Sequence, residues 1–193
     1  STSRAGRRWA GRRGRPYVAL EDGFLRSVGL GEAGAATLSL VVDDRGVYYD
    51  ATRPSRLEDL ILSAPDWCDA PMRARARALV DRIVASGVSK TNMGGPLDPG
   101  VLKRGPRILL VDQTEGDASI THGLASSASF AAMVAQARAE HPDAQLILKR
   151  HPAVAAGRKR GCVAERDLEG LTVIDADVRP ADLLAVVDQV WCV

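Results

Sequence analysis

Short apolar runs alternate with longer mixed segments in the second half of the chain. Continuous apolar runs bounded by glycine, proline or polar residues are typical of strands buried on both faces of a sheet. Between the runs, Ser126–Glu140 and Pro180–Val187 predict helices. The predicted strands are Arg107–Val111, Gln145–Arg150, Leu171–Ile174 and Gln189–Val193. This alternation predicts an α/β fold in which helices cover a parallel sheet.

The pattern in the first half predicts three short strands. Pro16–Leu20 is an apolar run that ends at the acidic pair Glu21 and Asp22. Leu38–Tyr49 contains two apolar runs separated by Asp43–Gly46, and a polar turn with glycine between two such runs is typical of a β-hairpin. We therefore expect one strand followed by a hairpin.

Two helices are predicted after the hairpin. Ser55–Leu62 begins at Ser55 with Glu58 three residues later, and this spacing indicates a capping box. Pro71–Val88 is longer, with arginines outside an apolar stripe of the kind that faces a core. The stripe comprises Leu79, Val80, Ile83 and Val84.

Ser89–Arg104 separates the two halves of the chain. It contains two prolines and three glycines, which interrupt regular structure. We interpret it as a connection and expect two sub-domains, residues 1–100 with the helical connection and residues 101–193.

Composition narrows the class of protein. Apolar residues make up 46% and charged residues 26% of the 193 residues, which is ordinary for a soluble globular protein. The net charge of +2 and 4% aromatic residues do not favour nucleic-acid binding by charge or base stacking. Cys68, Cys162 and Cys192 are far apart and indicate a reducing compartment. No apolar run approaches the roughly 20 residues of a membrane span, and no signal peptide is visible.

The two ends of the sequence suggest part of a longer protein. The chain begins without methionine and ends within a predicted strand, so we expect a fragment truncated at both ends. Arginines crowd its first residues, which indicates either a solvated surface or contact with an anionic lipid surface or polyanionic substrate. They are Arg4, Arg7, Arg8, Arg12, Arg13 and Arg15.

Three predicted strands end in charged or hydrogen-bonding residues. Glu21 and Asp22 follow the first, Gln113–Ser119 follows the strand at Arg107, and Lys149–His151 ends the next strand. Ligands of open α/β sheets bind beyond the carboxyl ends of the strands. Three such ends in one short chain predict a site.

Each of these groups also has a purely structural interpretation. Short acidic residues commonly stabilise turns through nearby backbone amides. Asp117 with Ser119 could cap a short helix, and His151 could be a loop histidine. These alternatives remain open from the residues alone.

The combination of charges fits transfer of a group from an anionic activated donor. Lys149 and His151 can neutralise a leaving phosphate by charge-assisted hydrogen bonds, while carboxylates can deprotonate an acceptor or attack an anomeric carbon. Arginine binds a carboxylate through two parallel hydrogen bonds, so Arg26, Arg53 and Arg56 could hold an acidic sugar.

Other reaction classes lack their motifs in this sequence. There is no G-x-x-x-x-G-K-[ST] or G-x-G-x-x-G segment and no G-x-S-x-G elbow, which disfavours the P-loop, the dinucleotide fingerprint and the α/β-hydrolase. His122, His141 and His151 lack the spacing of a zinc site, so we expect no metal.

Four segments together resemble the bacterial capsule polysaccharide β-Kdo transferases of the KpsC/LipA type, in the wider capsule-synthesis family. The resemblance covers the chain from about Pro16 to its end, with the motifs in order. The Gln-Thr-x-Gly-Asp form is similar to the amino-terminal transferase module of the two that such proteins usually carry. The segments are EDGFLRSVGLG from Glu21, SLVVDDRGVYYDATRPSRLE from Ser39, LLVDQTEGDASI from Leu109 and HPDAQLILKRHPAVAAGRKRG from His141.

The resemblance implies a GT-B-like glycosyltransferase with two Rossmann-like sub-domains, acceptor-side first and CMP-binding second. It implies transfer of Kdo from CMP-Kdo to a lipid-linked oligo-Kdo acceptor. The reaction would retain the configuration of the sugar through a carboxylate nucleophile, without metal or cofactor. It further implies a role in capsule biosynthesis and export at the cytoplasmic face of the inner membrane. The expected partners are the membrane surface and capsule assembly or export proteins, and not nucleic acid.

Residue roles follow from the matched motifs. Asp117 corresponds to the nucleophile, and Glu21 and Asp22 resemble the acidic pair before glycine that bacterial sialyltransferases use at the acceptor. His151 and Pro152 resemble the His-Pro motif that contacts the CMP phosphate. The remaining predicted contacts are Lys149, Gln113 and Ser119 for the donor and Arg26, Ser27, Arg53 and Arg56 for sugar.

Two departures and two alternatives accompany this interpretation. The Thr-Ser-rich segment and the Gly-Phe-Glu run with which the family helps to bind the nucleotide are not reached, and the amino-terminal beginning of the first sub-domain is expected to be missing. We therefore expect the chain to be inactive alone. The alternatives are a nucleotide-sugar epimerase or hydrolase of the same architecture and a non-catalytic module that binds a polyanion, for which affinity would depend steeply on salt.

Overall fold

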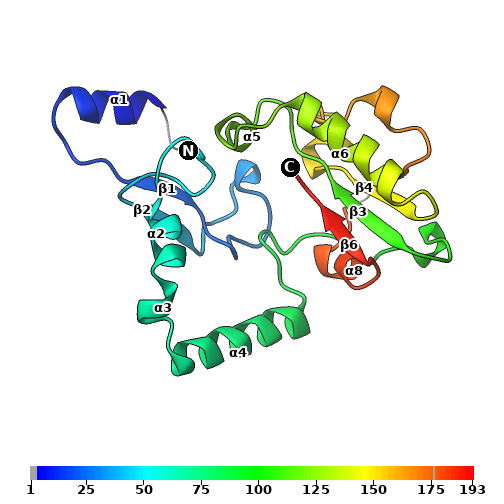
Figure 1. The fold of residues 1–193 in the computed structure, drawn as a ribbon, viewed down its shortest axis with the longest axis horizontal. Coiled ribbons are helices and arrows are strands. Elements are labelled where there is room, and N and C mark those ends of the chain that lie inside the picture. Colours follow the sequence, from blue (N-terminus) through cyan, green and yellow to red (C-terminus); the bar gives the residue numbers. More distant parts are fainter. Residues whose placement is uncertain (1–3, 176) are drawn as a thin grey trace. The chain divides into compact units, whose positions relative to one another are not determined.

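The computed structural model describes residues 4–175 and 177–193, which divide into two compact units between Asn92 and Met93 (Figure 1). This division falls within Ser89–Arg104, the segment interpreted as a connection. Each unit has its own sheet.

The second unit is built on a parallel sheet of four strands in the order β5-β4-β3-β6. Its central strand β3 pairs with β4 on one side and β6 on the other, and both pairings are parallel. The predicted parallel sheet is therefore confirmed. The strands are β3 (Arg107–Val111), β4 (Gln145–Lys149), β5 (Thr172–Ile174) and β6 (Gln189–Trp191).

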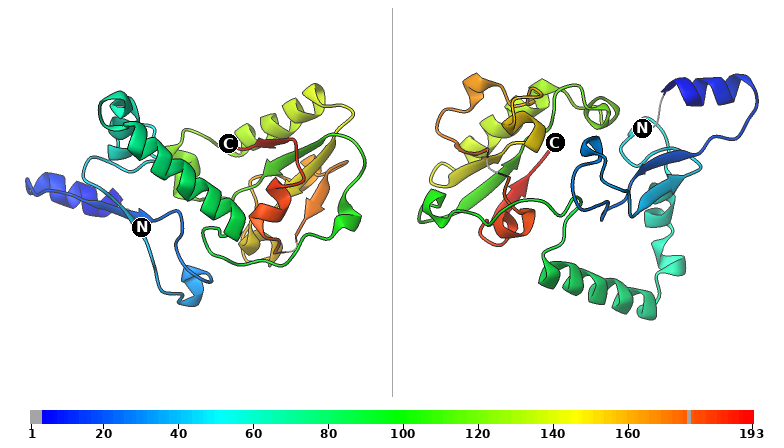
Figure 2. Two further views of the ribbon diagram at one scale, coloured as in Figure 1. Left: turned by 90° about the horizontal axis from the view of Figure 1, so that it is seen from below. Right: turned by 180° about the vertical axis from the view of Figure 1, so that it is seen from behind.

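Helices cover both faces of this sheet (Figure 2). Ile108 and Leu110 of β3 pack in one cluster with Phe130 of α6 (Ser127–Glu140), whereas Leu109 packs in a second cluster with Leu183 of α8 (Pro180–Leu184). Successive side chains of a strand point to opposite faces, which explains why the apolar run is continuous. Both helices were predicted, although α8 ends before Val187.

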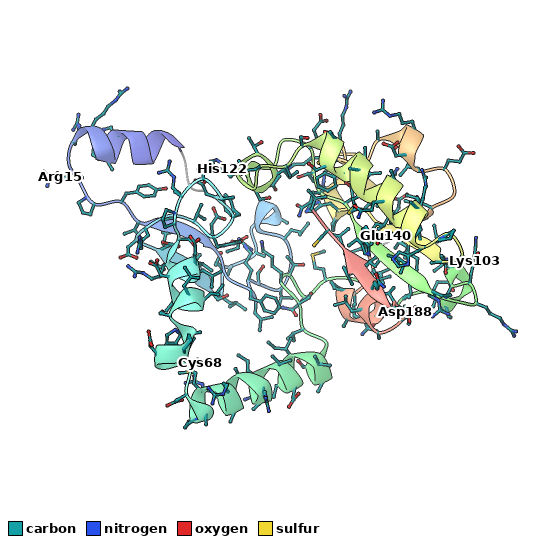
Figure 3. The ribbon with its side chains drawn as sticks, in the orientation of Figure 1. Arg15, Cys68, Lys103, His122, Glu140 and Asp188 are labelled. Atoms are coloured by element: carbon teal, nitrogen blue, oxygen red, sulfur yellow. The ribbon has the colours of Figure 1, made fainter. Side chains whose placement is uncertain are left out.

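Short helical turns complete the second unit, and two of them follow the carboxyl ends of strands. α5 (Ala118–His122) lies between β3 and α6, and its last residue is labelled in Figure 3. α7 (Pro152–Ala155) follows β4. Two 3-10 turns, η2 (Pro99–Val101) and η3 (Glu165–Asp167), lie in the connecting segments.

The first unit contains a two-stranded antiparallel sheet, with β1 (Ala19–Asp22) paired to β2 (Leu40–Asp43). β1 begins and ends later than the predicted strand Pro16–Leu20, so Glu21 and Asp22 belong to the strand and do not follow it. The other elements are α1 (Arg4–Arg12), η1 (Gly31–Ala33), α2 (Arg56–Leu62), α3 (Ala64–Trp67) and α4 (Ala70–Ser86).

The predicted hairpin at Leu38–Tyr49 is wrong. β2 pairs with β1, and the Asp43 carboxylate accepts hydrogen bonds from the backbone N–H groups of Arg45 (2.8 Å), Gly46 (2.9 Å) and Arg56 (2.8 Å). A side chain that satisfies these amides replaces the ladder that a hairpin would form. The chain consequently turns from β2 towards α2.

Side chains cap the starts of α2 and α4; the Ser55 cap was predicted and the Asp69 cap was not. The Ser55 hydroxyl accepts a hydrogen bond from Glu58 N at 3.1 Å, which is half of the predicted capping box. The Asp69 carboxylate accepts one from Met72 N at 2.8 Å and caps α4. Each cap satisfies an amide that the first helical turn leaves unpaired.

The apolar stripe of α4 is mostly exposed within the described residues, although Ile83 is partly buried. Leu79 is 54% and Val84 72% exposed, and no residue of α4 is buried. Helical periodicity identifies the face that can be buried but not the element that covers it. None of the described helices has the length and apolar character needed to cross a membrane.

Candidate functional site

Two of the predicted groups leave neighbouring strands of the second unit at its carboxyl edge. Val111 at the end of β3 is the register partner of Lys149 at the end of β4. Asp112 N continues the pairing by donating to Lys149 O at 3.1 Å. The segments that carry Asp117 and His151 therefore begin side by side at the sheet edge where α/β proteins bind ligands.

Asp117 caps α5 and remains exposed. Its Oδ1 accepts hydrogen bonds from Ser119 N at 2.9 Å and from the Ser119 hydroxyl at 2.8 Å. Gly116 precedes it with φ +80°, a left-handed conformation that a side chain would strain. The helix cap is thus the observed role of Oδ1, while Oδ2 makes no hydrogen bond within the described residues. Oδ1 therefore fixes the orientation of the side chain, and Oδ2 could act as a nucleophile.

Lys149 and His151 present two kinds of hydrogen-bond donor. Lys149 is half-buried and donates to Arg150 O at 2.8 Å. Burial lowers its pKa, which the nearby Asp177 and Asp175 carboxylates partly oppose. His151 is exposed, and its Nδ1 accepts from Ala153 N at 3.1 Å. A neutral ring that accepts at Nδ1 carries its proton at Nε2, so His151 presents an N–H donor there.

Pro152 begins α7 directly after His151. Proline at the first helical position has a suitable fixed φ and lacks an N–H that would otherwise be unpaired. The His-Pro pair is therefore the structural start of this turn. That role accounts for Pro152 without a ligand.

Asp112 is a buried acid that the sequence analysis missed. It is 4% exposed, and its Oδ1 accepts backbone hydrogen bonds from Gln113 at 2.8 Å and from Cys162 and Val163 at 3.0 Å each. Burial raises the pKa of Asp112, and the three hydrogen bonds offset only part of that effect. Its position as the first polar residue after an apolar run was the available signal.

Asp112 joins the loop after β3 to a second loop. Thr114 pairs with Gly161 as an isolated bridge, Glu115 N donates to Arg160 O at 2.8 Å, and Cys162 N donates to Gln113 O at 2.9 Å. A Cβ on Gly161 would collide with Asp112 Oδ2, so only glycine allows this close approach. The backbone of Gln113, predicted as a donor contact, thus supports this junction.

A cavity of about 480 Å³ lies against the junction. Arg150, Lys159 and Arg160 contribute positive charge to its lining, and Glu115 and Glu165 contribute negative charge. Arg150 is held by Glu165 at 2.9 Å and by Asp175 at 3.5 Å. The lining thus has only a small excess of positive charge, and the predicted residues Asp117, Lys149 and His151 are not part of it.

Glu21 and Asp22, in the first unit, are both engaged. Glu21 accepts a hydrogen bond from the Tyr49 hydroxyl at 3.0 Å. Asp22 pairs with Arg26 at 2.8 Å and with Lys90 at 3.6 Å. Their side chains are half-buried. Both carboxylates therefore lie at the end of β1 with hydrogen-bonding partners that hold their orientation.

Arg26 and Ser27 contact their own loop. Arg26 donates to Asp22 and to the Ser27 hydroxyl at 2.8 Å each, and its side chain is 13% exposed. Ser27 is fully buried and donates to Gly29 O at 2.7 Å. These contacts stabilise the glycine-rich loop and leave little of either side chain for a sugar.

Arg56 and Arg53 differ in their partners. Arg56 binds Asp44 through two nitrogens, at 2.9 and 2.7 Å. Within the described residues, Arg53 makes one ion pair, from Nε to Asp50 at 3.3 Å. The two-point contact that was predicted for a sugar carboxylate is thus already made by Asp44 at Arg56.

The second unit defines the general class of the protein. A parallel sheet covered on both faces, with polar and charged side chains beyond its carboxyl edge, is the architecture of open α/β proteins, which bind their ligands at that edge. The capsule polysaccharide biosynthesis protein family model matches residues 1–93 and 77–193, so the chain belongs to this family.

Relatives within the family agree with the predicted resemblance. Capsule polysaccharide modification protein LipA of Neisseria meningitidis serogroup B is 40% identical over 100% of this chain and 28% of its own length. Lipopolysaccharide-processing protein LpsZ of Rhizobium meliloti is 38% identical over 98% of this chain and 44% of its own. The chain thus spans less than half of these curated relatives.

Solved structures agree as well. Thermosulfurimonas dismutans KpsC, β-Kdo 2,4 transferase, superposes with a TM-score of 0.89 at 41% identity, over 100% of this chain and 60% of that one. Thermosulfurimonas dismutans KpsC, β-Kdo 2,7 transferase, has a TM-score of 0.60 at 24% identity over 95% of this chain and 55% of that one, which indicates a shared fold alone.

Proposed function

We propose that this chain is part of a β-Kdo transferase that moves Kdo from CMP-Kdo to a lipid-linked oligo-Kdo acceptor. The observation that carries the proposal is the 0.89 TM-score and 41% identity over the whole chain with the KpsC β-Kdo 2,4 transferase. Since the 2,7 transferase is only 24% identical, the linkage proposed is 2,4.

The proposed architecture is GT-B-like, with two Rossmann-like sub-domains. The second unit takes the nucleotide at the carboxyl edge of its sheet, and the first takes the acceptor. The KpsC chain is longer than the part matched here, which covers 60% of it. Turnover is therefore proposed for the longer polypeptide and not for these 193 residues alone.

Asp117 is the proposed nucleophile, and its geometry supports that role. Ser119 holds Oδ1, so Oδ2 attacks the anomeric carbon of Kdo. A bond forms between that carbon and Oδ2 while the bond to the CMP phosphate breaks, with the electron pair leaving on the phosphate. The Nε2–H of His151 and the ammonium of Lys149 stabilise the departing charge.

The second step returns the carboxylate. An acceptor hydroxyl attacks the same carbon, the bond to Asp117 breaks, and Glu21 or Asp22 takes the hydroxyl proton. Two displacements at one carbon preserve the configuration of the donor sugar. Each bond that breaks has a charged side chain assigned to it, and no metal is required in the scheme.

The setting proposed for this reaction is capsule biosynthesis and export at the cytoplasmic face of the inner membrane. The family supports the capsule setting, and the membrane location follows only if the acceptor is lipid-linked as proposed. Peripheral contact with that membrane and with export proteins belongs to the same proposal.

Mass spectrometry with CMP-Kdo tests the nucleophile. The longer polypeptide should gain one Kdo residue on the peptide that contains Asp117, and Asp117→Asn should abolish the adduct. Asp98→Asn is the matched control, because Asp98 is another carboxylate whose Oδ1 accepts from a backbone amide of its own turn, Gly100 N at 2.8 Å. An adduct on any other peptide would contradict the assignment.

Product analysis separates the transferase from the alternatives. A transferase gives an acceptor-dependent product. Isomerised nucleotide-sugar without acceptor would indicate an epimerase, and free Kdo as the main product would indicate a hydrolase. Binding of polysaccharide that is unchanged in Asp117→Asn, with no product, would indicate a polyanion-binding module.

A further inference from the structure

A second hollow lies entirely within the first unit, between β2 and α2. It has a volume of about 510 Å³, which is enough for a monosaccharide. Its lining is mostly polar and carries one cation. The residues that matter here are Tyr48, Asp50, Thr52, Arg53 and Glu58.

A buried carboxylate organises the floor of this hollow. Asp50 is 3% exposed, and its Oδ1 accepts from Thr52 N at 3.1 Å and from the Thr52 hydroxyl at 2.5 Å. Its Oδ2 lies 3.3 Å from Arg53 Nε. Asp50 therefore holds the turn and the direction of the Arg53 side chain, which reduces the entropy that a ligand would cost to order it.

Arg53 is the arginine of the predicted sugar-binding set whose terminal nitrogens are unused within the described residues. Its side chain is 46% exposed, and its contact to Asp50 uses Nε alone. Arg26 and Arg56, in contrast, each use a terminal nitrogen on a neighbouring side chain. The two terminal nitrogens of Arg53 thus remain for two parallel hydrogen bonds to a ligand carboxylate.

The neighbours of Arg53 suit the rest of a sugar. Tyr48 is 45% exposed and contacts Tyr49 edge to face, with 5.4 Å between ring centroids. This ring can pack against the C–H face of a pyranose. The Glu58 carboxylate makes no side-chain hydrogen bond or ion pair within the described part of the chain, so it can accept from sugar hydroxyls.

We propose that this hollow is a subsite for an acidic sugar, in which Arg53 binds the carboxylate and Tyr48 and Glu58 contact the ring. The inference rests on the proposed function, and the ligand is a Kdo residue of the acceptor. A negatively charged Glu58 beside the hollow disfavours a nucleotide phosphate, whose charge is greater than that of one carboxylate.

The test is a ¹H–¹⁵N NMR titration of the 193-residue chain with the methyl β-glycoside of Kdo. Amide shifts should concentrate in residues 48–58. The methyl ester of the same glycoside, which lacks the negative charge, should bind at least about tenfold more weakly. Equal binding of glycoside and ester, or stronger shifts with CMP than with the glycoside, would overturn the inference.

Two variants of Arg53 and one control variant test whether Arg53 binds the carboxylate. Arg53→Ala should lose about tenfold or more in affinity, whereas Arg53→Lys, which keeps the charge but not the two-nitrogen fork, should lose less. Arg45→Ala is the matched control, because Arg45 is 45% exposed and pairs with Asp59 outside the hollow. Unchanged amide shifts outside residues 48–58 verify the fold, and equal affinity of Arg53→Ala and wild type would refute the role of Arg53.

Different results would refute the inference and the proposed function. In the longer polypeptide, Arg53→Ala should raise the KM for a Kdo acceptor and leave the KM for CMP-Kdo unchanged. If Arg53→Ala transfers Kdo with an unaltered acceptor KM, the subsite is refuted and the transferase function stands. Glycoside binding at residues 48–58 without any transfer would keep the subsite and remove the transferase.

Discussion

Replacing Asp112 with alanine tests how the loops at the candidate donor site are held. The change removes an oxygen that accepts three backbone hydrogen bonds, from Gln113, Cys162 and Val163. Each hydrogen bond to a charged group contributes about 1.5–3 kcal/mol, and amides left unpaired in a buried place carry a further cost. Since such terms are not additive, we expect a loss of about 3–6 kcal/mol in the second unit.

The amide variant, Asp112→Asn, should cost much less than alanine. Burial raises the pKa of Asp112, so its folded surroundings favour the neutral form relative to the unfolded chain. The contribution from this protonation is fully present below the ordinary carboxyl pKa and is lost as pH rises through the folded pKa. At pH 7, therefore, the neutral side chain of Asp112→Asn should cost only about 1–2 kcal/mol.

Native-state hydrogen exchange measures this loss in one unit at a time. The amides to follow are those of Leu146–Leu148 in β4, whose side chains are buried in the second unit. Asp98→Ala, at an exposed cap of the same unit, is the matched control, with an expected loss of about 1 kcal/mol. The reasoning is refuted if Asp112→Ala costs no more than this control, or if the asparagine and alanine variants cost the same.

Further predictions concern pH, thiol reactivity, one helix cap and one exposed helix position. Burial disfavours ionised Asp43, but its three backbone hydrogen bonds outweigh this effect and lower its pKa. The stability of the first unit should therefore fall as pH drops below the ordinary carboxyl range, and circular dichroism should show less acid sensitivity in Asp43→Asn. Burial raises the pKa of Cys162 to about 11, so iodoacetamide at pH 7.5 should modify exposed Cys192 much faster, and equal rates would contradict the burial. Ser55→Ala should cost about 1 kcal/mol in urea unfolding by loss of the α2 cap, and no change would exclude that cap. Val84→Lys should alter stability by less than about 0.5 kcal/mol, since Val84 is 72% exposed; a larger loss in the same assay would show that the α4 stripe is covered.

The sheet of the second unit could be predicted because each strand carries its own signal. The run at Ile108–Val111 is too short for a helix, is apolar on both faces and is bounded by glycine and proline. Those properties are local, and the parallel order follows from the helices between strands. The ends of α8 and β5 shifted by only a few residues, as helix and strand ends commonly do.

The errors in the first unit arose from tertiary contacts. Asp43 looked like a hairpin turn residue, yet its carboxylate reaches Arg56 N, thirteen positions along the chain. No local pattern contains that contact. The α4 stripe likewise indicated a face without its partner. Such features depend on which distant amides and surfaces meet, and alternation of polar and apolar residues does not record that.

The candidate site was recognised by residue type and not by geometry. Asp117 was predicted both as nucleophile and as helix cap, and the structure gives the cap to one oxygen. Asp112 was missed because it follows an apolar run with no motif of its own. Three predicted arginines proved to have different partners, which their identical chemistry could not reveal.

The central proposal is that the second unit carries the donor half of a retaining β-Kdo 2,4 transferase. NMR analysis of the product tests it most directly, using the longer polypeptide, CMP-Kdo and a synthetic Kdo glycoside as acceptor. We expect one added Kdo, β-linked to O4 of the acceptor, and none with Asp117→Ala. An α-linked product, or a product that forms without the acceptor, would contradict the account.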